Sequence, residues 1–237
     1  MKKYLYYLPH IWTLTGLAFA ALALIAIFEG HYHSAARFCL LVLLVDRTDG
    51  TLARQLKIKE KFPGTSGEIL DIITDLVGLT FVPMMLFWKE GIFFTGFGVY
   101  LVVFATMAAS WKYSRKETFL SRGYSVGAPP VFFSVFLFYF LDLPLIYATV
   151  YTALLIALCI SPVRYPITSL VTTHWKPGYK SITNYLTAVF FIPAFILLKS
   201  APPVIYWMML SVIGMQLFIY PVLLSMGMIK PVFDRTF

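Results

Sequence analysis

Eight apolar stretches, separated by shorter polar ones, follow one another along the 237-residue chain. A helix needs about 20 apolar residues to cross the hydrocarbon core of a bilayer, and most of these stretches reach or approach that length. The fifth stretch is the weakest, because Pro129 and Pro130 open it and Pro144 follows its end, so we expect a short or tilted helix there. The pattern predicts helices at residues 10–29, 34–57, 66–88, 91–111, 127–141, 143–161, 181–199 and 203–227.

The composition indicates the environment of these helices. Hydrophobic residues make up 59% of the chain and charged residues 13%, and the mean hydropathy is +0.79, as is typical of an integral membrane protein. Eight spanning helices leave no room for a soluble domain. We therefore predict an all-α fold, a polytopic membrane helix bundle of about eight transmembrane helices, which forms a single domain over residues 1–237.

The Lys and Arg residues set the orientation of the bundle. With eight spans and the N-terminus inside the cell, fifteen of them fall on one side and three on the other, and Arg47 lies within the second helix. Loops rich in Lys and Arg stay in the cytoplasm, so both termini and the loop at 57–65 are expected there. The net charge of +8 reflects this bias and indicates no nucleic-acid partner. Cys39 and Cys159 fall near opposite ends of the membrane, so we expect no disulfide.

Four aspartates lie inside this apolar sequence: Asp46 and Asp49 near the end of the second stretch, and Asp71 and Asp75 near the start of the third. An ionised Asp at the bilayer centre costs about 2.5–3.5 kcal/mol, so a group of four indicates a function. Spacings of three and four residues place each pair on one helical face. Two facing pairs could hold two divalent ions, and carboxylate oxygens favour Mg²⁺ or Mn²⁺. Packing faces of small residues with protonated aspartates are the structural alternative.

The residues around the aspartates form a longer pattern, Asp46-x-x-Asp49-Gly50-x-x-Ala53-Arg54, a spacer, and then Gly67-x-x-x-Asp71-x-x-x-Asp75. These eight positions resemble the signature of the CDP-alcohol phosphotransferases. In one respect the pattern differs, because twelve residues, 55–66, lie between Arg54 and Gly67, where the family usually has eight. The longer spacer resembles that of the bacterial phosphatidylcholine synthases, which join free choline to CDP-diacylglycerol.

The resemblance implies roles for individual residues. Asp46, Asp49, Asp71 and Asp75 would hold two Mn²⁺ or Mg²⁺ ions, and Asp75 would also take the proton of the acceptor hydroxyl. His10 stands where many members of the family have Asn, and it is either a nucleotide contact or a solvated interfacial side chain. The nucleotide and its diphosphate would be bound by Asp49, Gly50, Ala53, Arg54 and Gly67.

The acceptor alcohol is the open question within this family. Choline carries a quaternary ammonium group, which aromatic rings bind by cation–π contact. Trp111 and Tyr185 are the candidate rings, and Glu68 is the candidate counter-charge. Serine, glycerol 3-phosphate and inositol phosphate are the alternative acceptors, and a phosphorylated one would favour a pocket built from Arg115, Lys116 and Arg122.

A transporter with a carboxylate relay is the alternative outside the enzyme class, since intramembrane acids are typical of transporters too. Against it, the chain shows no inverted repeat, and the acids gather in one helix pair. The partners expected for the enzyme are CDP-diacylglycerol, choline and membrane lipids, and a homodimer is one assembly open to it. The expected location is the bacterial inner (cytoplasmic) membrane, with the active site facing the cytoplasm.

Overall fold

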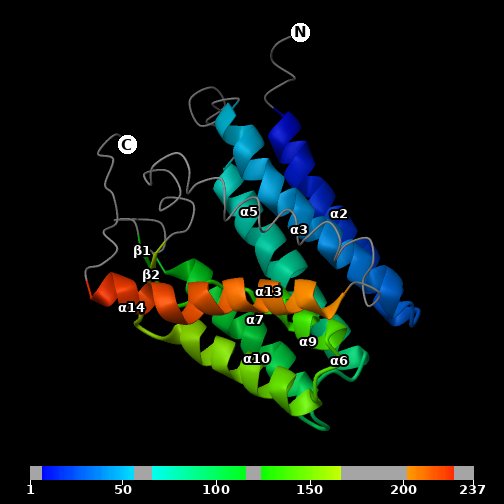
Figure 1. The fold of residues 1–237 in the computed structure, drawn as a ribbon. Helices are drawn as coiled ribbons and strands as arrows, with labels where there is room; N and C mark the ends of the chain where they lie inside the picture. The colour runs from blue at the N-terminus through cyan, green and yellow to red at the C-terminus, as the bar shows by residue number, and fades with distance from the viewer. Residues whose placement is uncertain (1–6, 56–65, 116–123, 167–201, 227–237) are drawn as a thin grey trace. The chain divides into compact units, whose positions relative to one another are not determined.

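A computed structural model describes residues 7–55, 66–115, 124–166 and 202–226. The chain divides into two compact units, Met1–Thr106 and Met107–Phe237, and each is described by itself. Figure 1 shows that helices dominate both. The helix predicted at 181–199 lies outside the described residues. The prediction of a single domain stays a prediction.

The first unit is built on a helical hairpin of α2 (Leu8–Phe28) and α3 (Tyr32–Gln55). The chain reverses at Gly30, whose φ of +77° is a conformation that glycine adopts without steric cost. Small buried side chains, including those of Ala20, Ala23 and Ala36, let the two helices approach closely. The hairpin brings the first turns of α2 beside the last turns of α3 (Figure 1).

A third long helix packs on this hairpin. It consists of α5 (Gly67–Thr74), the π-helix η1 (Asp75–Phe81) and α6 (Val82–Lys89), which follow one another without a break. Two glycines mark the closest contacts. A Cβ on Gly16 of α2 would lie 3.1 Å from Cγ2 of Thr74, and one on Gly78 would lie 2.6 Å from Cγ1 of Val42. An alanine at Gly78 would therefore require Val42 to move, whereas one at Gly16 would need only a small shift of Thr74.

The π-helical turn ends where the backbone N–H of Val82 donates to the carbonyl of Val77, five residues back. Pro83 follows directly. Proline has no N–H to donate, and its ring crowds the carbonyl four residues back in an α-helix. A wider turn before Pro83 accommodates this ring and keeps the chain helical.

In its described residues, the second unit contains short helices and one pair of strands. α7 (Gly98–Ser114) crosses the boundary between the units. Strands β1 (Tyr124–Val126) and β2 (Arg164–Pro166) pair antiparallel, with Ser125 opposite Tyr165. Tyr206 is fully buried, and the centre of its ring lies 5.0 Å from the centre of the Phe140 ring. The remaining elements are η2 (Phe132–Val135), α9 (Phe136–Phe140), α10 (Leu145–Ile160), α13 (Pro203–Gly214), η4 (Met215–Ile219) and α14 (Tyr220–Ser225).

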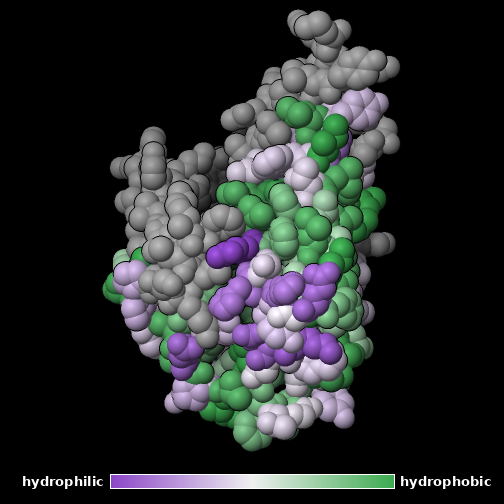
Figure 2. Space-filling model, turned by 90° about the vertical axis from the view of Figure 1, so that its right-hand side faces the viewer, coloured by the Kyte–Doolittle hydropathy of each residue, from purple (hydrophilic) through white to green (hydrophobic). Residues whose placement is uncertain are grey.

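Two helices in the described part of the chain are long and apolar enough to cross a membrane, Leu8–Phe28 and Gly67–Lys89. Leu145–Ile160 and Pro203–Ile219 are apolar but shorter. Large side chains along α2, such as Ile11, Ile25 and Phe28, are more than half exposed. Figure 2 shows hydrophobic residues over much of one face, with hydrophilic residues gathered in a smaller area. These features suggest a membrane protein, and the eight-span topology stays a prediction.

The predicted elements agree with the structure unevenly. The first three predicted helices match α2, α3 and the α5–η1–α6 helix within a few residues. The fourth begins at Gly98 instead of residue 91, because Gly91 and Gly96 both have positive φ and form turns before it. The fifth is short, as expected. The all-α prediction missed the β1–β2 pair, whose three-residue strands are too short to show a period-2 pattern.

Candidate active site

Three of the four predicted metal ligands come together in the first unit. Asp46 and Asp49 lie near the end of α3, and Asp71 lies in α5. One carboxylate oxygen from each of them lies within 4.8 Å of the others. The hairpin and the packing of α5 against it thus bring together side chains 25 residues apart in the sequence, from Asp46 to Asp71.

Asp49 is held from the neighbouring helix. It is buried, and its Oδ2 accepts a hydrogen bond of 2.8 Å from Oγ1 of Thr13, which is also buried. Beside this pair, Nε1 of Trp12 donates to Oγ1 of Thr48 over 2.8 Å. Sequence reasoning missed both contacts. One sequence signal could have identified Thr13. In an antiparallel hairpin the start of the first helix lies beside the end of the second, so a hydroxyl near the start of the first apolar helix is expected close to Asp46 and Asp49.

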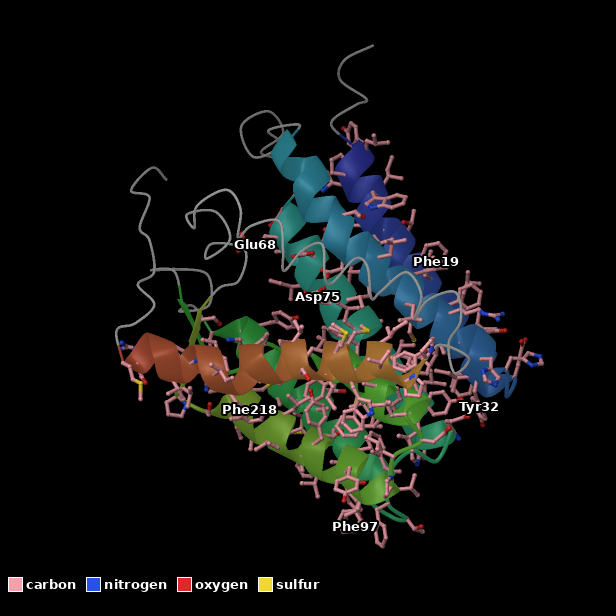
Figure 3. The ribbon with its side chains drawn as sticks, in the orientation of Figure 1. Phe19, Tyr32, Glu68, Asp75, Phe97 and Phe218 are labelled. Atoms are coloured by element: carbon pink, nitrogen blue, oxygen red, sulfur yellow. The ribbon has the colours of Figure 1, made fainter. Side chains whose placement is uncertain are left out.

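Asp75 has a different place from the other three aspartates. It is the first residue of η1, one helical turn beyond Asp71. Among the described residues, the group of closely spaced carboxylates comprises Asp46, Asp49 and Asp71 without it. Its Oδ1 is shielded from solvent. Figure 3 shows Glu68 near the start of α5 and Asp75 further along the continuous α5–η1–α6 helix.

Gly67 lies against His10, for which the sequence left two roles open. His10 is buried, not solvated, and a Cβ on Gly67 would lie 3.2 Å from its Cε1. The space beside Gly67 is therefore bounded by this imidazole. Gly50, Ala53 and Arg54 lie in α3 after Asp49, and the side chains of Ala53 and Arg54 lie outside the described part of the structure.

The predicted acceptor residues fall in separate parts of the chain. Glu68 is an exposed residue in the first turn of α5, where a negative charge also stabilises the helix N-terminus. Trp111 lies in the part of α7 that belongs to the second unit, and its side chain is 57% exposed. Tyr185, Lys116 and Arg122 lie outside the described residues.

Arg115 has partners of its own in the second unit. Its guanidinium donates to the carbonyls of Ile160 and Ser161 at 2.7 and 3.1 Å, at the end of α10. It also lies 5.8 Å from the centre of the Trp111 ring. Arg115 thus satisfies carbonyls that the helix end leaves without intrahelical partners, which is a structural role.

The aspartate group fits a hard divalent cation. Mg²⁺ and Mn²⁺ prefer oxygen ligands, and all three side chains offer carboxylate oxygens. Three such charges within 4.8 Å repel one another, and a cation would relieve this repulsion. The residues present therefore fit a metal ion, and the identity of the ion is open.

The sequence model of the CDP-alcohol phosphatidyltransferases matches residues 6–163, which is more than half of the chain. This range contains the aspartate group and the helices that carry it. The protein therefore belongs to the CDP-alcohol phosphatidyltransferase family, and the predicted resemblance and enzyme class are confirmed at this level.

Three curated relatives are phosphatidylcholine synthases by name. That of Borreliella burgdorferi is 31% identical over 123 residues, 52% of this chain and 53% of the relative. That of Agrobacterium fabrum is 28% identical over 204 residues, 79% of this chain and 83% of the relative. That of Legionella pneumophila is 24% identical over 216 residues, 89% of this chain and 85% of the relative. In the match to the Borreliella protein, the chain spans about half the length of its relative, and in several others half or less.

Proposed function

We propose that this protein transfers the phosphatidyl group of CDP-diacylglycerol to choline, which gives phosphatidylcholine and CMP. The observation that carries the proposal is the group of Asp46, Asp49 and Asp71, three motif carboxylates within 4.8 Å of one another. The family match supports phosphatidyl transfer as the reaction. The names of the relatives support choline as the acceptor.

In the proposed reaction the hydroxyl oxygen of choline attacks the phosphorus that carries diacylglycerol. The bond from this phosphorus to the oxygen bridging it to CMP breaks, and CMP leaves with the electron pair. The hydroxyl proton passes to Asp75, whose position one turn beyond Asp71 suits a base beside the carboxylate group. Gly50, Ala53 and Gly67 leave room for the nucleotide, and Arg54 contacts the diphosphate.

Asp46, Asp49, Asp71 and Asp75 would hold two Mn²⁺ or Mg²⁺ ions. Such ions, when bound, neutralise a diphosphate and stabilise the charge that develops during transfer. The protein itself contributes the fixed carboxylates, the buried position of Asp49 and the close packing of α2, α3 and α5.

Transfer to a phosphorylated acceptor is the second candidate function. The contacts of Arg115 argue against this residue as a phosphate ligand. Arg115 was a candidate phosphate ligand, and its guanidinium instead donates to the carbonyls of Ile160 and Ser161. Binding a phosphate would require it to give up these bonds. This favours choline as the acceptor, and Trp111, Tyr185 and Glu68 stay the proposed acceptor contacts.

The proposed setting is the bacterial inner membrane, with eight spans, both termini in the cytoplasm and the active site open to it. A homodimer fits this proposal. CDP-diacylglycerol, the proposed donor of the phosphatidyl group, is itself a membrane lipid, so its acyl chains would stay in the bilayer. A carboxylate-relay transporter remains the remoter alternative, and it predicts no CMP release.

The proposal is tested with the purified full chain in phosphatidylcholine-free vesicles that contain CDP-diacylglycerol. Labelled choline, serine, glycerol 3-phosphate and inositol phosphate are supplied separately with Mn²⁺, and lipid product and CMP are measured together. We expect labelled phosphatidylcholine and an equal amount of CMP with choline only. Product with a different acceptor would refute the choline assignment, and no CMP with any acceptor would refute phosphatidyl transfer.

A further inference from the structure

We propose that Thr13 is a positioning residue, whose hydroxyl fixes the Asp49 carboxylate in the orientation needed for metal binding. This inference rests on the proposed function, because it assigns Thr13 to the same site. Thr13 lies in α2, outside the aspartate motif, and its Oγ1 donates to Oδ2 of Asp49 over 2.8 Å. Both residues are less than 10% exposed.

The geometry gives the Thr13 hydroxyl a defined direction. Its Oγ1 also lies 3.1 Å from the carbonyl oxygen of Pro9, one turn earlier in α2. A Thr in a helix adopts few rotamers, and a contact with the carbonyl four residues back selects one of them. A hydroxyl has one hydrogen, and the carboxylate is the stronger and closer acceptor. The hydroxyl is thus aimed across the helix pair at Asp49.

The carboxylate needs such a fixed partner. Oxygens of Asp46, Asp49 and Asp71 lie within 4.8 Å of one another, and like charges at this distance favour rotation of the side chains away from one another. A hydrogen bond to one oxygen of Asp49 opposes this rotation. The buried setting strengthens this bond relative to one in water. Residues that orient a metal ligand in this way typically change metal affinity by about 10- to 100-fold.

A purely structural role, in which the bond joins α2 to α3, makes a different prediction. The neighbouring bond from Trp12 to Thr48 joins the same two helices, and Thr48 is exposed and carries no charge. Thr48→Val therefore removes a bond between α2 and α3 and leaves the carboxylates alone. Thr13→Val keeps the shape of the side chain and removes its donor, whereas Thr13→Ser keeps the donor.

The test measures Mn²⁺ binding to the purified full chain without substrate, from the electron paramagnetic resonance signal of free Mn²⁺. We expect Thr13→Val to weaken binding about 10- to 100-fold and to raise the Mn²⁺ concentration for half-maximal activity by a similar factor. Activity should recover at excess Mn²⁺. Thr13→Ser and Thr48→Val should weaken Mn²⁺ binding by less than about tenfold, the lower limit expected for loss of an orienting partner, because Thr13→Ser keeps the donor and Thr48→Val leaves the bond to Asp49 in place. Thr13→Ala serves in place of Thr13→Val if the latter does not fold.

The outcomes separate this inference from the proposed function. If the wild type binds Mn²⁺ and transfers choline, and Thr13→Val binds Mn²⁺ as tightly as Thr48→Val does, the role of Thr13 is refuted and the proposed function stands. If the wild type binds no Mn²⁺, the metal site and the role of Thr13 are both refuted.

Discussion

The imidazole of His10 lies against Gly67, so close that a Cβ on Gly67 would stand 3.2 Å from its Cε1. Because His10 is buried, its ring has little room to withdraw. We expect Gly67→Ala to lower the free energy of unfolding by about 1 kcal/mol, the lower end of the usual cost of overpacking, and to lower activity. Thermal unfolding in detergent measures the first effect and CMP release the second.

A double variant shows whether the contact with His10 is the cause. In His10→Ala/Gly67→Ala the crowding is gone, so its loss of stability should be smaller than the sum of the two single losses. Gly214→Ala is the matched control, because nothing lies within 4 Å of a Cβ there. Additive losses would mean that the contact between His10 and Gly67 is energetically unimportant.

Removal of the metal or of its ligands should abolish transfer. Asp49→Asn and Asp71→Asn keep the side-chain shape and lose the charge, so we expect activity to fall at least 100-fold, which corresponds to about 2.7 kcal/mol or more of lost transition-state stabilisation. Wild-type activity should vanish in excess EDTA and return with Mn²⁺. Asp142→Asn is the control, since Asp142 is exposed and has a positive φ of 49°, which Asn also tolerates. Full activity in excess EDTA would refute the proposed metal dependence.

The packing at Gly78 predicts a loss that a second substitution repairs. A Cβ on Gly78 would stand 2.6 Å from Cγ1 of Val42, which is fully buried. Gly78→Ala should therefore destabilise the first unit by about 1–3 kcal/mol. Val42→Ala removes the obstructing methyl groups, so Val42→Ala/Gly78→Ala should be more stable than additivity predicts. Thermal unfolding of all four proteins tests this, and strict additivity would contradict the close approach of the two helices.

Substitutions at the proposed acceptor pocket should separate the two acceptor classes. A cation–π contact contributes about 0.5–2 kcal/mol, so Trp111→Leu and Tyr185→Leu should raise the KM for choline about 2- to 30-fold. The KM for CDP-diacylglycerol should stay unchanged. Arg115→Ala should lower thermal stability, because two carbonyls at the end of α10 lose their donor, without raising the choline KM. The reverse pattern, silent aromatic substitutions and a raised acceptor KM in Arg115→Ala, would favour a phosphorylated acceptor.

The predicted topology can be tested with single cysteines. Cys39 and Cys159 are both buried, so the native background should react little with an impermeant maleimide. Lys59→Cys should be labelled only from the cytoplasmic side, and Lys89→Cys only from the opposite side. Labelling from the reversed sides would overturn the orientation that the positive residues predict.

The sequence predicted the parts of the fold that depend on long apolar periodicity. α2, α3 and the helix from Gly67 to Lys89 follow such runs, and the aspartate spacing predicted which side chains share a face. Contacts between helices could not be predicted in this way, because the spacing of residues along one helix does not show which faces of two helices pack together. The bond from Thr13 to Asp49 depends on the register of the α2–α3 hairpin. The burial of His10 depends on where α5 starts. Neither can be read from spacing along one segment.

The π-helical segment Asp75–Phe81 also bears on how this chain could change length during evolution. A π-turn holds one residue more than the α-turn it replaces, so a homologue one residue shorter there could close the segment as ordinary α-helix. The helix after it would then keep nearly the same orientation, because a π-turn absorbs its extra residue within that turn, and Asp46, Asp49 and Asp71 would keep their positions. A single-residue gap within 76–81 in an aligned relative would thus mark the loss of the π-turn rather than a damaged catalytic centre.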